Sequence, residues 1–250
     1  YYGAKDFENL RKSLAHSYRL TAFIAAGVLI LSQSFASLVL TGLHTPSNII
    51  GMSLLYLRII FCGIPATAAY NMFDSALRAM GNSKTPLTAM IIASVLNVSL
   101  DILFVAGFGW GVAGAAIATV IAQSFSAVYC FLILRRIDIV HLTRADFMPA
   151  SGMNARLMKL GIPVVFQNII IGVGGLVVQY VINGYGFLFV AGFTATNKLY
   201  GLLEMAAISY GYAIVTYVGQ NLGAGKIDRI RKGVRSSMLL SLLTSLIISA

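Results

Sequence analysis

The amino-acid sequence predicts an all-α membrane protein, a polytopic bundle of helices built from an internal repeat. Hydrophobic residues make up 58% of the 250 residues and charged residues 10%, whereas a soluble domain carries about 25% charged residues. The mean hydropathy is +0.83. Long apolar runs place such a chain in the membrane class. The second observation is that one segment of the chain occurs twice.

The repeated segment covers residues 1–20, YYGAKDFENLRKSLAHSYRL, and residues 221–240, NLGAGKIDRIRKGVRSSMLL. Each copy has a Gly-Ala turn, a basic amphipathic run and an apolar run. Periods of a few dozen residues are typical of solenoids, but a displacement of 220 positions indicates two copies of a half-protein. The identities are Gly3, Ala4, Arg11, Lys12, Ser17 and Leu20, matched by Gly223, Ala224, Arg231, Lys232, Ser237 and Leu240.

The apolar runs between the two copies predict six membrane-spanning helices, because each run has about the 20 residues that a span needs. Pro65 predicts a kink in the second of them. Residues 135–159 are the only long polar stretch and predict a linker with some amphipathic helix. The predicted spans are residues 20–43, 49–80, 87–106, 112–134, 162–182 and 188–218.

The distribution of positive charge predicts the orientation of these helices. Six spans return the chain to the side on which it started, so both Gly-Ala turns are expected on one side. All but two of the 18 Lys and Arg residues fall on that side, and the exceptions are Arg58 and Lys198. Positive residues mark the cytoplasmic side. The net charge of +10 therefore reflects orientation in a lipid bilayer, and we expect no nucleic-acid partner.

The repeat also predicts the domain organisation. Six helices between equivalent points indicate a six-helix lobe used twice in parallel orientation, as in many secondary transporters. Residues 1–134 would be the last four helices of the first lobe, residues 135–159 a cytoplasmic inter-lobe linker, and residues 160–250 the first helices of the second lobe. We expect an interior part of a longer protein of about twelve helices, since the chain starts inside a loop motif and ends in a short apolar run.

Asp101 is the first candidate for a functional residue. A charge at the bilayer centre costs about 2.5–3.5 kcal/mol on insertion scales. Ser94, Asn97 and Asp101 share a helical face, at i, i+3 and i+7 spacing. A carboxylate beside an amide can carry a proton or bind a small cation with hard oxygens. The alternative is a structural carboxylate that pairs with a neighbouring helix.

Glu204 and Asn197 share a face of the last predicted span with small residues, which suits a water-filled cavity and equally suits close helix packing. The amides of Gln167, Asn168 and Gln179 lie along the fifth predicted span and can bond across helices or to a ligand. We place all five on a candidate substrate and ion pathway.

Arg58 lies well inside the second predicted span. It can extend its head group to the interface or pair with a carboxylate such as Asp101, and we include it in the pathway. Asp74 and Arg78 are an i, i+4 pair, for which a structural role is favoured.

The sequence contains no motif that indicates an enzyme. There is no phosphate loop, zinc-ligand spacing or nucleophile elbow, and Cys62 and Cys130 sit singly inside apolar runs. We predict a protein without catalytic residues, resident metal or cofactor.

Several motifs, in order, resemble the multidrug and toxic compound extrusion (MATE) transporters, of the DinF-like bacterial branch. They are YNMFDSALRAMGNSKTPL (70–87), ASVLNVSLDILFV (93–105), GVAGAAIATVIAQ (111–123), FTATNKL (193–199) and YVGQNLGAGKIDRIRKGVR (217–235).

The resemblance implies two six-helix lobes, alternating access, and export of amphipathic organic cations and drugs in exchange for Na⁺ or H⁺. It implies a multi-pass protein of the bacterial inner membrane, and we expect a monomer. Some members have a Glu after the proline of the seventh helix, whereas PVVFQNIII (163–171) has none here, so both coupling ions stay open. The alternative is a flippase for lipid-linked saccharides of the same superfamily, which would favour a strongly cationic cavity.

Overall fold

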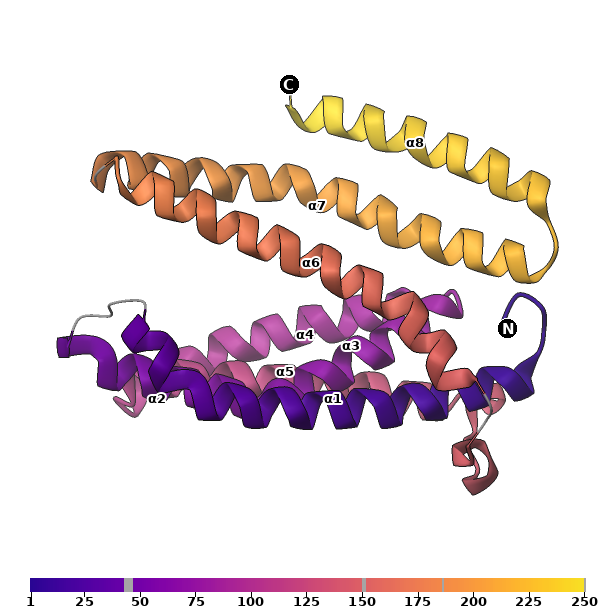
Figure 1. Cartoon of the computed structure of the whole chain (residues 1–250), viewed down its shortest axis with the longest axis horizontal. Coiled ribbons are helices and arrows are strands. Elements are labelled where there is room, and N and C mark those ends of the chain that lie inside the picture. Colours follow the sequence, from indigo (N-terminus) through magenta and orange to yellow (C-terminus); the bar gives the residue numbers. More distant parts are fainter. Residues whose placement is uncertain (43–46, 150–151, 186, 250) are drawn as a thin grey trace. The chain divides into compact units, whose positions relative to one another are not determined.

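The computed structural model describes the whole chain except residues 43–46, 150–151, 186 and 250 (Figure 1). Within the described part the regular structure is helical, with no strand, as the sequence predicts. Two compact units form, one of Phe7–Ala150 and the other of Tyr1–Asp6 with Ser151–Ala250. The sequence analysis places the linker between the two lobes at residues 135–159, on the basis of the two copies of the repeat. That division stays a prediction.

The first unit begins with α1 (Phe7–Gly42), followed by α2 (Ser47–Cys62) and α3 (Ile64–Ala79). The predicted second span is the pair α2 and α3, which meet at a bend of 41°. Pro65 lies in the first turn of α3, where its missing N–H does no harm but its ring prevents the preceding helix from continuing. The turn predicted before α2 falls partly on residues 43–46, outside the described residues.

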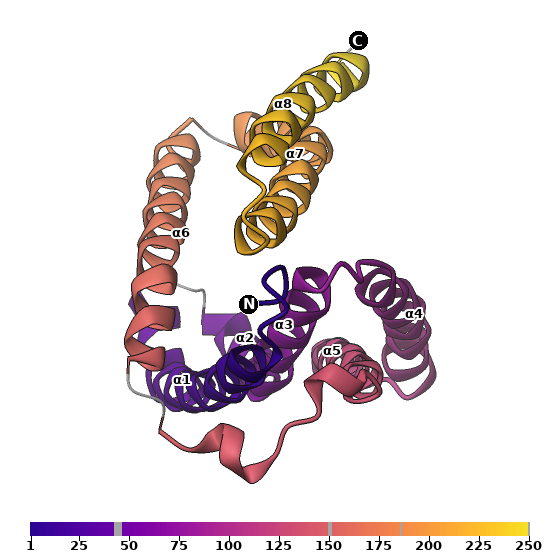
Figure 2. The same ribbon diagram turned by 90° about the vertical axis from the view of Figure 1, so that its right-hand side faces the viewer.

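The fourth helix, α4 (Lys84–Asp101), continues as a π-helix, η1 (Ile102–Gly107), and α5 (Gly111–Arg135) follows. Figure 2 views this bundle nearly end-on. The helix α5 packs against α2, α3 and α4, and α1 packs against α2 and α3. The third predicted span is thus confirmed, but its final turns are wider than an α-helix.

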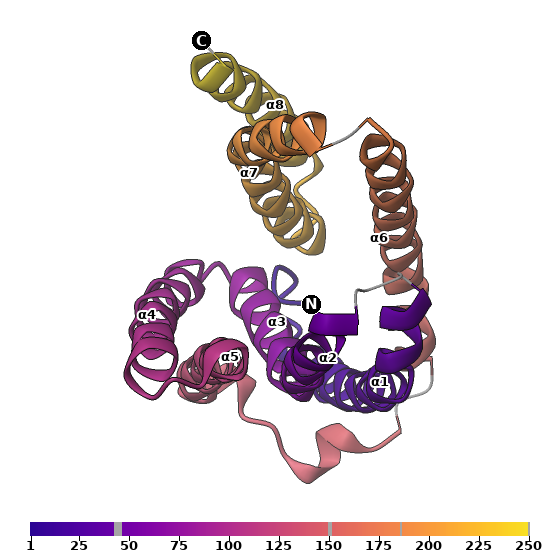
Figure 3. The same ribbon diagram turned by 90° about the vertical axis from the view of Figure 1, so that its left-hand side faces the viewer.

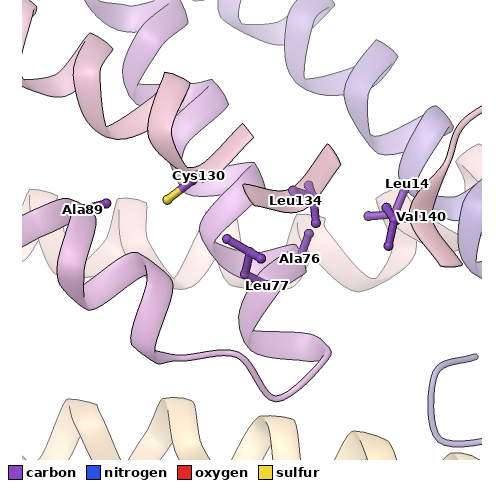
Figure 4. Close-up of a cluster of buried hydrophobic side chains, with 7 residues drawn as sticks. All are labelled: Leu14, Ala76, Leu77, Ala89, Cys130, Leu134 and Val140. Carbon is purple, nitrogen blue, oxygen red and sulfur yellow. The ribbon is translucent and has the colours of Figure 1, made fainter. Parts of the chain in front are cut away.

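The core of this unit is small and rich in short side chains. Figure 4 shows the cluster, to which α1, α3, α4, α5 and the following segment contribute. Short side chains let helix backbones approach closely, and the buried Cys130 acts as a small apolar residue. Most large apolar side chains instead face outward; Phe23, for example, is 81% exposed. The cluster is Leu14, Ala76, Leu77, Ala89, Cys130, Leu134 and Val140.

The polar segment after α5 forms two short 3₁₀ turns, η2 (Asp138–Val140) and η3 (Arg144–Phe147), and the helical part of the predicted linker is confined to residues from Met153 onward. Asp146 closes η3, because its Oδ2 accepts hydrogen bonds from the Thr143 N–H at 2.7 Å and the Thr143 hydroxyl at 2.8 Å. Such local bonds compete with a longer helix.

Basic residues of α1 hold this segment in place. Arg11 Nε lies 3.6 Å from Asp146 Oδ1, and Arg19 Nη1 donates to the Phe147 carbonyl at 2.9 Å. The buried His16 ring lies 3.1 Å from the Met148 carbonyl through Nε2. Burial alone would raise the pKa of Asp146, but the Thr143 hydrogen bonds and the Arg11 charge together lower it.

The second unit contains α6 (Met153–Asn183), α7 (Phe187–Gly223) and α8 (Ile227–Ser249). The helices α7 and α8 lie side by side (Figures 1 and 3). The predicted start of the fifth span at residue 162 is wrong, because α6 starts at Met153, whereas α8 forms one helix from Ile227 across its basic and apolar parts. Pro163 lies inside α6.

By length and composition, four of the described helices can each cross a membrane, and the bent pair α2 and α3 forms one more. The four segments are Phe7–Gly42, Lys84–Gly107, Gly111–Arg135 and Met153–Ile182. The helix α7 covers the sixth predicted span and is 37 residues long. The protein is an all-α polytopic membrane protein.

The two Gly-Ala turns of the repeat pack against each other inside the second unit, where Figure 1 shows the N-terminal loop beside the turn between α7 and α8. A Cβ added to Gly3 would lie 1.9 Å from the Gln220 carbonyl oxygen, and one added to Gly223 would lie 3.0 Å from the Ala4 nitrogen. The expectation that both turns lie on one side is therefore met.

Candidate functional site

A polar pocket of about 380 Å³ lies between α3, α4 and α5. Hydroxyl and amide side chains from three membrane helices meet here, although the surrounding bundle is apolar. Polar groups inside a membrane bundle are costly and mark candidate ligand pathways. The lining residues are Thr67, Tyr70, Asn71, Met90, Ala93, Ser94, Asn97, Thr119, Ala122, Gln123 and Ser126.

Helical spacing brings these side chains to one place. On α5, Thr119, Gln123 and Ser126 follow at i, i+4 and i+7 and so share a face. The Thr67 hydroxyl of α3 donates a hydrogen bond to Gln123 Oε1 at 2.5 Å. This bond joins two walls of the pocket and leaves the Gln123 amide nitrogen to face other groups.

Two polar atoms of α4 are buried without a partner among the described residues, namely Asn97 Nδ2 and Asp101 Oδ1. Asn97 lines the pocket, and Asp101 lies one turn further along the same face. A buried polar atom without a hydrogen bond is expensive, so such atoms are expected to meet a ligand, water or another helix. The two residues thus lie one turn apart on one face of α4, and their joint role at a substrate or ion site stays a prediction.

The backbone changes form directly after Asp101, where the π-helix η1 begins. A π-turn is rare and is often found at functional sites. The helix α5 lies close to this π-turn, since a Cβ added to Gly114 would lie 3.0 Å from Phe104 Cβ. Asp101 is therefore held at a place where the helix geometry departs from the regular pattern.

The other acidic residue of this region has a structural role. The Asp74 carboxylate is buried and pairs with Arg78 one turn later on α3, which confirms the sequence prediction. A buried carboxylate is retained only when it is paired or hydrogen-bonded.

Arg58 does not pair with Asp101, so that alternative is wrong for the described residues. Its side chain is exposed on α2, and α2 packs against α1, α3 and α5 but not against α4. The Arg58 carbonyl accepts a hydrogen bond from Gln33 Nε2 at 2.8 Å. The exposed side chain can extend outward along α2 toward the membrane interface, which is the other alternative.

The remaining predicted pathway residues lie on α6 and α7, in the second unit. All five side chains are exposed, and none lines one of the described pockets. The Asn168 amide donates to the Val164 carbonyl of its own helix at 3.0 Å. Their role stays a prediction. They are Gln167, Asn168, Gln179, Asn197 and Glu204.

The sequence prediction missed the contribution of α5 to the pocket. The i, i+4, i+7 spacing of Thr119, Gln123 and Ser126 was the available signal. It is weak because Ser and Thr commonly bond to their own helix backbone, as Thr119 does to the Ala115 carbonyl at 2.9 Å.

Two further hollows contain none of the predicted pathway residues. An apolar cavity of about 420 Å³ lies between α1, α3 and α5, beside Pro65 and Phe73. A groove of about 660 Å³ runs between α7 and α8, where the Tyr210 hydroxyl lies 2.8 Å from Thr244 Oγ1.

Comparisons with known proteins agree with this architecture. The MatE family profile matches residues 1–103 and 163–250. The chain is 35% identical over 195 residues to the probable multidrug resistance protein YpnP of Bacillus subtilis, covering 78% of this chain and 44% of that protein. It is 27% identical over 248 residues to the probable multidrug resistance protein YoeA of the same organism, covering 96% and 54%. The multidrug export protein MepA of Staphylococcus saprophyticus is 24% identical over 227 residues, covering 90% and 50%.

Solved structures share the fold. A MOP superfamily transporter from Pyrococcus furiosus, described as having a binding pocket of reverse polarity, superposes with a TM-score of 0.91 at 20% identity, over 98% of this chain and 55% of that one. The outward-facing conformation of a multidrug resistance MATE family transporter gives a TM-score of 0.90 at 20% identity, over 98% and 55%.

The chain spans about half the length of the curated relatives it matches. Both segments of the family profile fall on the membrane helices described above, and together they cover most of the residues. This chain therefore belongs to the MATE family of membrane transporters.

Proposed function

We propose that this chain provides part of an ion-coupled antiporter, a transporter and not an enzyme, that exports amphipathic organic cations and drugs. The observation that carries the proposal is the polar pocket of the first unit, with the buried and unpartnered Asn97 Nδ2 and Asp101 Oδ1 beside it. The names of the relatives YpnP and MepA, which refer to multidrug resistance and export, support drug-like substrates.

Asp101 is the group that can couple an ion to transport. Its carboxylate can take up a proton, or it can bind Na⁺ together with neighbouring amide and hydroxyl oxygens, which are hard ligands. Binding of either ion neutralises the negative charge. An organic cation in the same lobe would lose an attractive partner when the charge is neutralised, so ion binding would favour its release.

Alternating access would complete the cycle, with the site open first to one side and then to the other. The internal duplication supports this step, because two equivalent lobes moving about a central site is a common arrangement in repeat-built transporters. We further propose that the protein acts as a monomer in the bacterial inner membrane.

The flippase alternative receives less support. A diphosphate carrier needs cations along its path, whereas the lining of the pocket between α3, α4 and α5 is uncharged and the nearby Asp101 is acidic. Arg58 lies on the exposed side of α2.

The test is ethidium efflux from cells or vesicles that contain the full-length protein with imposed Na⁺ or H⁺ gradients. We expect gradient-dependent efflux that Asp101→Asn abolishes at unchanged expression. The matched control is Asp138→Asn, the same change at a fully exposed linker carboxylate, which should behave as wild type. Ethidium efflux that ignores both gradients, or an active Asp101→Asn variant, would overturn the proposal.

A further inference from the structure

The helix α8 has one face that is occupied by α7. A Cβ added to Gly233 would lie 2.2 Å from a ring carbon of Tyr217, and the Tyr217 hydroxyl donates to the Arg229 carbonyl at 3.2 Å. Further along the same face, Thr244 contacts the Tyr210 hydroxyl. These contacts determine which side of α8 faces α7.

The start of α8 carries a cluster of exposed cations, of which Arg231, Lys232 and Arg235 lie away from the side that faces α7. The side chains of Arg229, Arg231, Lys232 and Arg235 are all exposed, and so is Lys226 just before the helix. Within the described part of the chain, none of the five has an ion pair or a side-chain hydrogen bond. The one acidic residue in the stretch 226–235 is Asp228. We call these five residues the α8 basic face.

Large apolar side chains continue this face toward the end of the helix. Leu239, Leu242 and Leu246 follow Lys232 and Arg235 at alternating spacings of three and four, which keeps them in line along a helix. They are 54%, 58% and 59% exposed, and Leu239 and Leu242 also border the groove between α7 and α8. A change from cations to exposed leucines along one helical face is typical of the boundary between lipid head groups and acyl chains.

The first copy of the repeat uses the equivalent cations differently. Arg11, which corresponds to Arg231, lies 3.6 Å from the linker residue Asp146. Lys12, which corresponds to Lys232, lies 2.6 Å from Glu8. The same basic motif is therefore neutralised within the protein in the first copy but not in the second.

We propose that the α8 basic face binds the phosphodiester head groups of anionic phospholipids in the cytoplasmic leaflet. Arginine presents a fork of donors that matches phosphate oxygens, and each cation near an anionic membrane surface adds to the attraction. The positive charge favours anionic over zwitterionic lipids. The leucines that follow the cations along α8 would contact the acyl chains of the same lipids.

The experiment measures phosphatidylglycerol and phosphatidylcholine retained by the purified protein in detergent, using native mass spectrometry. We expect preferential retention of phosphatidylglycerol, and a roughly thirtyfold weaker affinity in the double variant Arg231→Gln with Lys232→Gln. The variant Arg231→Lys keeps the charge and should retain most of the binding.

The repeat offers a matched control, because Arg11→Gln with Lys12→Gln makes the identical change at the equivalent positions. This control should leave phosphatidylglycerol retention unchanged. Size-exclusion profiles confirm that each variant is folded. Equal retention of the two lipids, or an equal loss in the two double variants, would overturn the proposal.

Discussion

Gly3 and Gly223, which occupy the same position in the two copies of the repeat, meet backbone to backbone. A Cβ on Gly223 would lie 3.3 Å from both the Cα and the carbonyl carbon of Gly3. Neither residue has a positive φ, so the requirement for glycine here is one of space and not of backbone conformation. Two corners related by duplication therefore form one contact.

The first prediction compares the loss of stability caused by Gly→Ala substitutions in the two Gly-Ala turns. Gly3→Ala would place its Cβ 1.9 Å from the Gln220 carbonyl oxygen, which is backbone and cannot move alone, whereas Gly223→Ala meets atoms at 3.0 Å and beyond. We expect Gly3→Ala to lower the melting temperature in detergent clearly more than Gly223→Ala, since overpacking costs about 1–3 kcal/mol. The control Gly27→Ala has open space and should be neutral or slightly stabilising. Equal effects at Gly3 and Gly27 would contradict the packing.

The second prediction concerns pH at the linker. Because the pKa of Asp146 is lowered in the folded state, its contribution to stability is present above the ordinary Asp pKa, about 3.9, and is lost as the pH falls below it. We expect amide hydrogen exchange in the η3 turn to increase in acid beyond the change in intrinsic rate. Asp146→Asn should exchange faster at neutral pH and lose this pH dependence. An unchanged exchange rate in that variant would show that the carboxylate does not hold the turn.

The third prediction concerns the hydrogen bond between Thr67 and Gln123 across the pocket. Removing one partner leaves the other buried, at a cost of about 1–3 kcal/mol, whereas removing both costs less. A double-mutant cycle of Thr67→Val and Gln123→Leu, followed by melting temperature, should therefore show coupling, with the double variant more stable than the sum of the two single changes. Strict additivity would mean that the bond contributes nothing.

Sequence patterns predicted the helices well where long apolar runs made them unambiguous. The bend at Pro65 and the Asp74–Arg78 pair followed from local rules, and both are present. The start of α6 at Met153 was missed, because the polar residues 153–159 were assigned to the linker rather than to the helix that continues from them. The π-helix after Asp101, which packs against α5, was missed as well, because no local sequence pattern indicates it.

The candidate site was also predicted only in part, because some of its residues can be recognised within one helix and others depend on how the helices pack. Asp101 and Asn97 stand out as polar residues in an apolar helix, and their shared face follows from helical spacing alone. The partners Thr67 and Gln123 depend on which helices are neighbours, and sequence order did not reveal that α3 and α5 pack together. The suggested pairing of Arg58 with Asp101 failed because adjacency in sequence was taken as adjacency in space.

The last prediction separates ion binding from folding at Asn97. Asn97→Leu keeps the approximate size of the side chain but removes the amide that lies one turn from Asp101. If a cation or proton at Asp101 is stabilised by this amide, the half-maximal ion concentration for transport should rise about tenfold, since hydrogen bonds to charged groups contribute roughly 1.5–3 kcal/mol. The maximal rate at saturating ion should change less. The control is Ser99→Ala on the same helix, whose hydroxyl bonds to the Val95 carbonyl at 2.8 Å and is exposed. A rise of the same size in both variants would indicate a general weakening of α4, whereas a rise confined to Asn97→Leu assigns the effect to the site beside Asp101.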